Sequence, residues 1–166
     1  LVASISISYN ETVREVVVPA SMTELEASAF ANCTALEKVT FPSNSALCRI
    51  GDFAFSFSSL KQITLPDAVT KIPNSCFHGC TALEEVNMPS VTEIGEEAFV
   101  ECKSLKKIRI PDAVTELPTN CFLLCSALEE VVISDNSSLT KLGDSAFSDC
   151  VSLKRINIPN SVTEIC

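Results

Sequence analysis

The sequence has little of what several functional classes require. Its 166 residues include no Trp, one His and one Tyr, and 12 basic residues stand against 21 acidic ones, which gives a net charge of −9. A nucleic-acid-binding protein needs a basic surface that displaces counterions from phosphates, so this charge balance argues against such a partner. No apolar run approaches the ~20 residues that cross a bilayer, and we expect no membrane insertion in this stretch of chain.

Motifs for catalysis are missing as well. The chain contains no G-x-S-x-G, HExxH, Walker or GxGxxG pattern. The single His78 lies at a variable position of the repeat, which Val100, Leu123 and Ser148 occupy in other copies, so we expect a surface residue and not a general base. Cys76-x-x-x-Cys80 resembles half a zinc site but lacks the second pair or His that such a site needs. We therefore predict that the chain is not an enzyme, with no catalytic residues, no cofactor and no metal site.

An internal repeat covers nearly everything after residue 12. Each copy reads L-x-x-V/I-x-φ-P, then V-T-x-I/L, then G/P-x-x-A/C-F and a Cys, and successive copies begin 22 to 25 residues apart. We predict an N-terminal flank or partial repeat over 1–12 and tandem repeats over 13–166. The predicted copies are 13–35, 36–59, 60–82, 83–104, 105–127, 128–152 and the partial 153–166. Because the last copy is partial, we expect a longer array.

The spacing inside one copy predicts its local structure. Val86 and Met88 alternate with Asn87 as in a strand, and a Pro follows that strand in six of seven copies, where it ends the sheet ladder. The Ala/Cys, Phe and Cys that follow are four residues apart or less, which predicts one or two turns of α- or 3₁₀-helix. Stacked copies would align their central rings: Phe30, Phe55, Phe77, Phe99, Phe122 and Phe147.

The pattern L-x-x-I-x-I-P-x-x-V-T-x-I-G-x-x-A-F-x-x-C-x-x-L resembles the BspA-like (Treponema-type) leucine-rich repeats. This resemblance implies an α/β fold, a leucine-rich-repeat solenoid with a curved parallel β-sheet on its concave face and short α- or 3₁₀-helices on its convex face. It also implies a non-catalytic protein–protein interaction module, used in cell-surface recognition or adhesion. An intracellular structural scaffold subunit of a large assembly is the alternative that the residues leave open.

Two further regularities modify this repeat. The Pro–Cys and Gly–Ala types of copy alternate, so the full period is a pair of copies, about 45 residues. The charged pairs at 84–85, 106–107, 129–130 and 154–155 alternate in sign, which predicts opposite charges on neighbouring strands. In the second copy, a deletion is expected to place Phe57 at the Cys position.

Five of the nine cysteines occupy one repeat position, and we expect them to form a buried column of free thiols: Cys33, Cys80, Cys102, Cys125 and Cys150. Stacked neighbours have parallel Cβ directions, which disfavours disulfides. Localisation stays open, because the resemblance implies a surface or secreted protein whereas free thiols favour a reducing compartment.

The best binding candidates are the strand positions that point away from the core, since they have no packing role. They are Glu15, Lys38, Thr40, Gln62, Thr64, Glu85, Asn87, Lys107, Arg109, Glu130, Val132, Arg155 and Asn157. This face has no Tyr, Trp or Phe anchor. Apolar Phe53, Leu123 and Leu124, and two lengthened loops over 43–49 and 134–141, are alternative contact surfaces for a protein partner.

Overall fold

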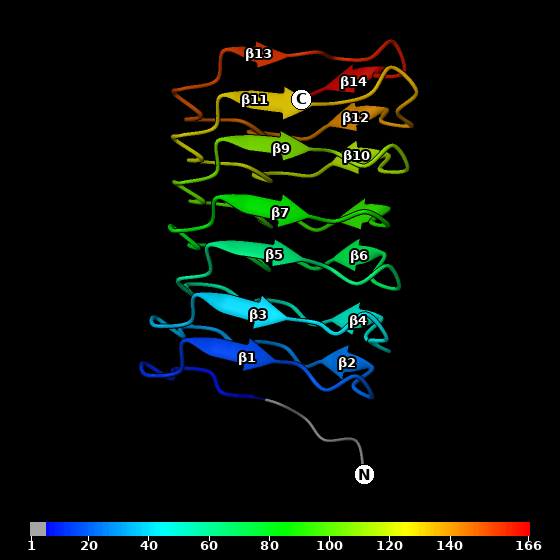
Figure 1. The fold of residues 1–166 in the computed structure, drawn as a ribbon. Helices are drawn as coiled ribbons and strands as arrows, with labels where there is room; N and C mark the ends of the chain where they lie inside the picture. The colour runs from blue at the N-terminus through cyan, green and yellow to red at the C-terminus, as the bar shows by residue number, and fades with distance from the viewer. Residues whose placement is uncertain (1–5) are drawn as a thin grey trace.

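Each repeat forms one rung of a parallel β-solenoid in the computed structural model, which describes residues 6–166 (Figure 1). A rung contributes one strand to each of two columns. The first column consists of β1 (Glu15–Val17), β3 (Lys38–Thr40), β5 (Gln62–Thr64), β7 (Glu85–Asn87), β9 (Lys107–Arg109), β11 (Glu130–Val132) and β13 (Arg155–Ile156). The second consists of β2 (Glu24–Leu25), β4 (Arg49–Ile50), β6 (Lys71–Ile72), β8 (Glu93–Ile94), β10 (Glu116–Leu117), β12 (Lys141–Leu142) and β14 (Glu164–Ile165).

The first strand column has the predicted alternation. Lys38 and Thr40 are exposed on β3 while Val39 between them is buried, and β5 and β9 repeat this pattern. The register is parallel throughout, so that equivalent residues of successive rungs are direct neighbours, as Glu15 and Lys38 are. The outward side of this column, formed by the first and third residues of each strand, is called the strand face below.

The predicted α/β class and its short α- or 3₁₀-helices on the convex face are wrong, because residues 6–166 contain no helix. The segment after the second strand is a series of turns in which backbone donors alternate. The N–H groups of Ser28, Phe30 and Asn32 donate to the next rung, and those of the residues between them donate three residues back within the rung. Ser28 and Asn32 have φ of 59° and 57°, values that a right-handed helix excludes.

The second strand column was not predicted from the sequence. The V-T-x-I/L segment of each repeat contributes only two residues to its strand. The ladder of this column divides into β2–β4, β6–β8 and β10–β12–β14. The N–H of Gly95 donates to the carbonyl of Ile72 at 2.8 Å, but Pro73 and Pro118 occupy the equivalent position in rungs 3 and 5 and have no N–H. The ladder is therefore interrupted before each of these rungs, which is the structural counterpart of the 45-residue period.

Glycine at position 95 is required by how closely two rungs approach. A Cβ on Gly95 would lie 2.5 Å from the backbone nitrogen of Asn74 and 2.6 Å from the carbonyl carbon of Pro73. Neither atom can move without shifting the chain of rung 3. The Gly-type rung therefore packs directly on the Pro-type rung that precedes it.

The interior is organised around the predicted stack of rings. Successive Phe centroids from Phe30 to Phe147 are 5.0–5.5 Å apart and the ring planes are within 15° of parallel. The first five rings are fully buried, and Phe147 in rung 6 is partly buried. These rings and the Leu, Ile and Val side chains of both strand columns form one continuous core along the stack.

The cysteine column is confirmed, with one correction in rung 2. Cys33, Cys80, Cys102 and Cys125 are buried free thiols, and Cys150 is half-buried. The Cys position of rung 2 is occupied by Ser58, which is buried, and not by Phe57, which is 49% exposed. The backbone shows this, because Ser58 N–H donates to the Phe55 carbonyl as Cys33 N–H does to that of Phe30.

Candidate interaction surface

Twelve of the thirteen predicted binding residues belong to the first strand column and lie on the strand face, and Asn157 follows directly after β13. Eleven of the thirteen are exposed, while Glu130 and Val132 are half-buried. Four rungs align Glu15, Lys38, Gln62 and Glu85 in one register row, and the last three align Lys107, Glu130 and Arg155 in another. The structure thus assembles one outward row of polar side chains over rungs 1 to 4 and a second row over rungs 5 to 7. Whether a partner binds there stays a prediction.

The predicted pairing of opposite charges is confirmed in rungs 5 to 7 but is wrong between rungs 4 and 5, where neither Glu84 nor Glu85 makes an ion pair with another residue of 6–166. Lys107 Nζ lies 2.8 Å from Glu130 Oε2, Lys154 Nζ lies 2.7 Å from Glu129 Oε2, and Arg155 lies 3.6 Å from Glu130. The hydrogen bond from Lys107 lowers the pKa of Glu130, and that from Lys154 lowers the pKa of Glu129. On the strand face of rungs 5 to 7, Glu130 is therefore already paired with bases of the same chain, and Glu129, just before β11, is paired as well.

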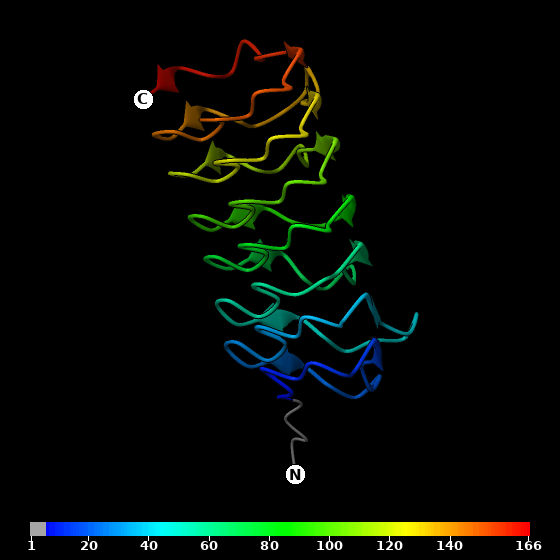
Figure 2. The same cartoon turned by 90° about the vertical axis from the view of Figure 1, so that its left-hand side faces the viewer.

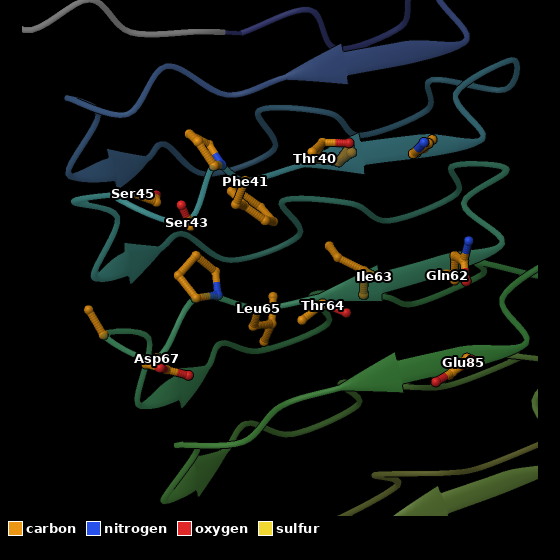
Figure 3. A pocket seen from close by; sticks show the side chains of 15 residues that line it. Thr40, Phe41, Ser43, Ser45, Gln62, Ile63, Thr64, Leu65, Asp67 and Glu85 are labelled. Carbon is orange, nitrogen blue, oxygen red and sulfur yellow. The ribbon is translucent and has the colours of Figure 1, made fainter.

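Rungs 2 and 3 differ, because a groove of about 710 Å³ opens between β3 and β5 (Figure 3). Its floor includes Thr40 and Thr64 on the two neighbouring strands. Phe41, Pro42, Leu65, Pro66 and Ala68 supply its apolar lining. Lys38, Gln62, Glu85, Asp67, Ser43 and Ser45 supply its polar groups. Five of the thirteen predicted residues therefore line one concavity: Lys38, Thr40, Gln62, Thr64 and Glu85.

The groove exists because β3 and β5 separate soon after they pair. Their ladder has a single register pair, Lys38 with Gln62, whereas β1–β3 and β5–β7 each pair over three residues. After β1 and β5 the next N–H, that of Val18 or Leu65, donates to the following rung at 2.9 Å. The equivalent N–H of Phe41 has no hydrogen-bond partner among the described residues.

The groove also contains charges without ion-pair partners in the described part of the chain. Lys38 and Glu85 lie in one register row with neutral Gln62 between them, and Glu15 is the register neighbour of Lys38 on its other side. Neither Lys38 nor Glu85 makes an ion pair with another residue of 6–166, and nor does Asp67. The groove therefore presents one ammonium and two carboxylates to solvent.

The two lengthened loops differ in their relation to this groove. Ser43 and Ser45 of the first loop line it, and in Figure 2 the cyan segment after β3 protrudes from the stack. The second loop, over 134–141, does not border it, and its Ser138 N–H is bonded to the Asp112 carbonyl. Only the first loop is part of the candidate site.

Besides the groove, the turn segments expose a few apolar side chains, and only some of them were predicted from the sequence. Phe53 is 47% exposed and Leu124 is 37% exposed, as expected, whereas Leu123 is half-buried. Phe57 was missed because it was assigned to the core. Its ring lies 5.2 Å from that of His78, which is half-buried with Nδ1 3.7 Å from Glu97.

Among residues 6–166, no three His, Cys, Asp or Glu side chains form a group that could hold a metal ion. The same residues include no helix that is long and apolar enough to span a membrane.

Comparison with known proteins agrees with the repeat architecture. The family model described as BspA type leucine rich repeat region matches residues 6–128 and 48–166. A leucine-rich repeat protein of Treponema pallidum is 26% identical, with a TM-score of 0.65 over 89% of this chain and 80% of its own. One from Eubacterium ventriosum is also 26% identical, with a TM-score of 0.76 over 93% of this chain and 41% of its own.

A third, from Bacteroides ovatus, is 26% identical with a TM-score of 0.53, and covers 93% of this chain and 54% of its own. The chain therefore spans about half the length of the Bacteroides and Eubacterium proteins. The comparison with curated proteins found no match.

Proposed function

The chain belongs to the BspA-type leucine-rich repeat family, and from that premise we propose that it recognises a protein partner at a cell surface, in adhesion or a related contact. The family is generally non-catalytic and its members typically bind proteins. The observation that carries the proposal is the strand face, where a row of side chains without packing roles runs into the groove between β3 and β5. In this proposal the strand face is the contact surface.

An adhesion assay tests this proposal. The chain is displayed on a non-adherent bacterium, and retention on a panel of immobilised extracellular proteins is measured. The double variant Thr40→Arg and Asn87→Arg places two bulky charged side chains on the strand face. Glu96→Arg, at an exposed turn residue, is the matched control. Retention that is lost only in the double variant supports the proposal. Absence of retention on every protein contradicts it, and retention that survives in the double variant excludes the strand face.

The free cysteines favour a second candidate, an intracellular scaffold subunit. All nine are unpaired, and six of them are buried. Disulfides persist in oxidising compartments, so a thiol-rich chain suits a reducing one. A free-thiol count on protein from its native source, alkylated at lysis and denatured without reductant, separates the candidates. Nine free thiols favour the scaffold, and several paired cysteines favour the surface module.

A further inference from the structure

We propose that the second strand column is the contact surface of a homodimer, in which a second copy of this chain packs in the opposite direction on the outward charges of the column. The strand face belongs to the first column, so this inference goes beyond the proposed function and does not depend on it. The order of the charges along the stack carries the inference.

Every strand of the second column has one outward charged residue. The strands lie one above another along the whole stack (Figure 1). Five of the seven charged residues are exposed, and those of rungs 1 and 6 are half-buried. From rung 1 to rung 6 their signs are negative, positive, positive, negative, negative and positive. They are called the second-column charges below: Glu24, Arg49, Lys71, Glu93, Glu116, Lys141 and, in rung 7, Glu164.

Within one copy, opposite charges are neighbours inside each ladder of the column but not where the ladder is interrupted. Arg49 lies 2.6 Å from Glu24, and Lys71 lies 2.5 Å from Glu93. At the interruptions two like charges are neighbours, Arg49 and Lys71 before rung 3 and Glu93 and Glu116 before rung 5. Like charges at neighbouring strand positions are destabilising. One copy therefore presents a cationic pair and an anionic pair, two rungs apart, on one surface.

A second copy that runs in the opposite direction compensates both pairs. With a two-fold axis between rungs 3 and 4, rung 3 of one copy faces rung 4 of the other, rung 2 faces rung 5 and rung 1 faces rung 6. Because the strands of both copies repeat at ~4.8 Å, the facing positions match along the whole contact. All six positions then face a charge of opposite sign, in an isologous interface of the commonest kind. The facing pairs are Lys71 with Glu93, Arg49 with Glu116, and Glu24 with Lys141.

The neighbouring registers lack this complementarity. Moving the second copy by one rung places either Lys71 or Glu93 opposite itself, according to the direction of the shift. A second copy that runs in the same direction in register places every second-column charge opposite itself. Electrostatic complementarity fixes register and suppresses wrong arrangements, so the charge order selects one antiparallel contact.

The residues beside the second-column charges allow a close approach. An exposed Thr directly precedes the charged residue in every rung except rung 2, where exposed Cys48 takes its place. The hydroxyls of Thr92 and Thr140 already donate to backbone carbonyls of the preceding rung, at 3.3 and 3.1 Å. Their burial in a contact therefore leaves no donor unpaired, which is the usual cost of burying a hydroxyl.

Sedimentation equilibrium of the whole chain tests the proposal. Exposed ion pairs are individually weak, so association is followed up to about 200 µM. The buffer contains about 150 mM NaCl, because this screens the long-range repulsion between two chains of net charge −9. We expect a monomer–dimer equilibrium, and a chain that stays monomeric throughout this range overturns the proposal.

Two single variants and their mixture test the arrangement. Lys71→Glu and Glu93→Lys each bring like charges together twice across the axis, so each should dimerise at least tenfold more weakly than the wild type. An equimolar mixture of the two variants should form a heterodimer, because each copy supplies the charges that the other lacks. Lys107→Glu is the matched control, since it breaks an ion pair on the strand face with the same change in net charge, and it should leave dimerisation unchanged. Circular dichroism of every variant verifies folding.

The possible failures are distinct. A dimer that survives both Lys71→Glu and Glu93→Lys overturns the assignment to the second column, as does a dimer that only Lys107→Glu dissociates. Single variants that dissociate but do not associate with each other overturn the antiparallel register. The adhesion assay remains a separate measurement of the proposed function, since Lys71→Glu and Glu93→Lys change no residue of the strand face.

Discussion

The thiol of Cys102 donates a hydrogen bond to the backbone carbonyl of Phe77, one rung earlier, over 3.3 Å. Cys80, Cys125 and Cys150 do the same with the Phe carbonyl of the preceding rung at 3.0–3.1 Å. The column therefore links successive rungs in addition to filling the core. Sequence reasoning treated these side chains only as small apolar groups.

Replacement of Cys102 tests this link. We expect Cys102→Ser to lower the free energy of unfolding by about 1–3 kcal/mol, because it buries a hydroxyl on a shorter side chain. Cys102→Ala should remain folded and lose less, and the exposed Cys48→Ser should be neutral. Urea denaturation measures all three. A Cys102→Ser variant as stable as the wild type would contradict the role of the thiol.

Ser58 offers the converse experiment. It occupies the Cys position of rung 2, and its hydroxyl reaches the Cys80 sulfur at 3.5 Å. Ser58→Cys should extend the column to the Phe30 carbonyl and raise the free energy of unfolding by about 1 kcal/mol, the value of one typical hydrogen bond. Ser59→Cys, at the neighbouring half-buried position, should bring no gain. Thermal denaturation under reducing conditions shows whether the two variants differ.

Stability should fall in alkali because of the same column. Burial raises the pKa of the Cys80 thiol to about 11, from 9.0 when it is not buried. Between these values the unfolded chain releases a proton that the folded chain retains, so Cys80 stabilises the fold below pH 9 and this contribution is lost as the pH rises through 11. The loss for Cys80 is about 3 kcal/mol. Denaturation from pH 8 to 10.5 in reductant should show a shallower decline for Cys80→Ala.

Acid should weaken the ion pairs that Glu37 makes with Arg14 and Lys61 on neighbouring rungs. Lys61, hydrogen-bonded at 2.5 Å, and then Arg14 lower the pKa of Glu37. A carboxyl with a lowered pKa stabilises the fold above its unfolded value of 4.5, and this contribution disappears as the pH falls through the folded value. Glu37→Gln should therefore lose less stability than the wild type between pH 5 and pH 3. Glu84→Gln, in the same column without an ion pair to residues 6–166, serves as the control. A wild-type and Glu37→Gln decline of equal slope would count against this pairing.

The contact between Gly95 and rung 3 predicts a strong effect of one methyl group. Gly95→Ala forces the Cβ against the backbone at Pro73 and Asn74, and we expect a loss of about 1–3 kcal/mol. Glu96→Ala, at the next and exposed position, should be nearly neutral. Chemical denaturation compares them, and similar midpoints would show that the rungs can separate without cost.

Periodicity in the sequence was sufficient to predict the rungs, the Phe30-to-Phe147 stack, the thiol column and the outward residues, because each depends on one position that recurs. The helices were wrong because a spacing of four between Ala29 and Cys33 fits a helical turn and also a series of turns with alternating donors. Residue letters do not distinguish the two, since the choice depends on bonds to the next rung.

The groove could not be predicted for a different reason. It results from how far β3 and β5 remain paired, and this is a property of the junction between two rungs rather than of either repeat. Lys38, Gln62 and Glu85 could be placed on the strand face, but nothing in the repeat pattern distinguished them from Lys107 or Glu130. Similarly, Ser58 was overlooked because a hydroxyl at a thiol position breaks the pattern while it keeps the backbone.

The proline interruptions at rungs 3 and 5 bear on how such a chain can change in length. Within the pair of rungs 3 and 4, the N–H of Gly95 donates a hydrogen bond to the Ile72 carbonyl in the second column. Pro73 and Pro118 cannot donate the equivalent hydrogen bond to the rung before them, so the ladder stops before rungs 3 and 5. The pair of rungs 3 and 4 is thus a cassette whose second-column ladder, β6–β8, is complete within it, while the ladder of rungs 5 and 6 continues into β14 of rung 7. Gain or loss of one cassette, about 45 residues, leaves the remaining ladders unbroken. Gain or loss of a single rung would place two Pro-type or two Gly-type rungs in contact.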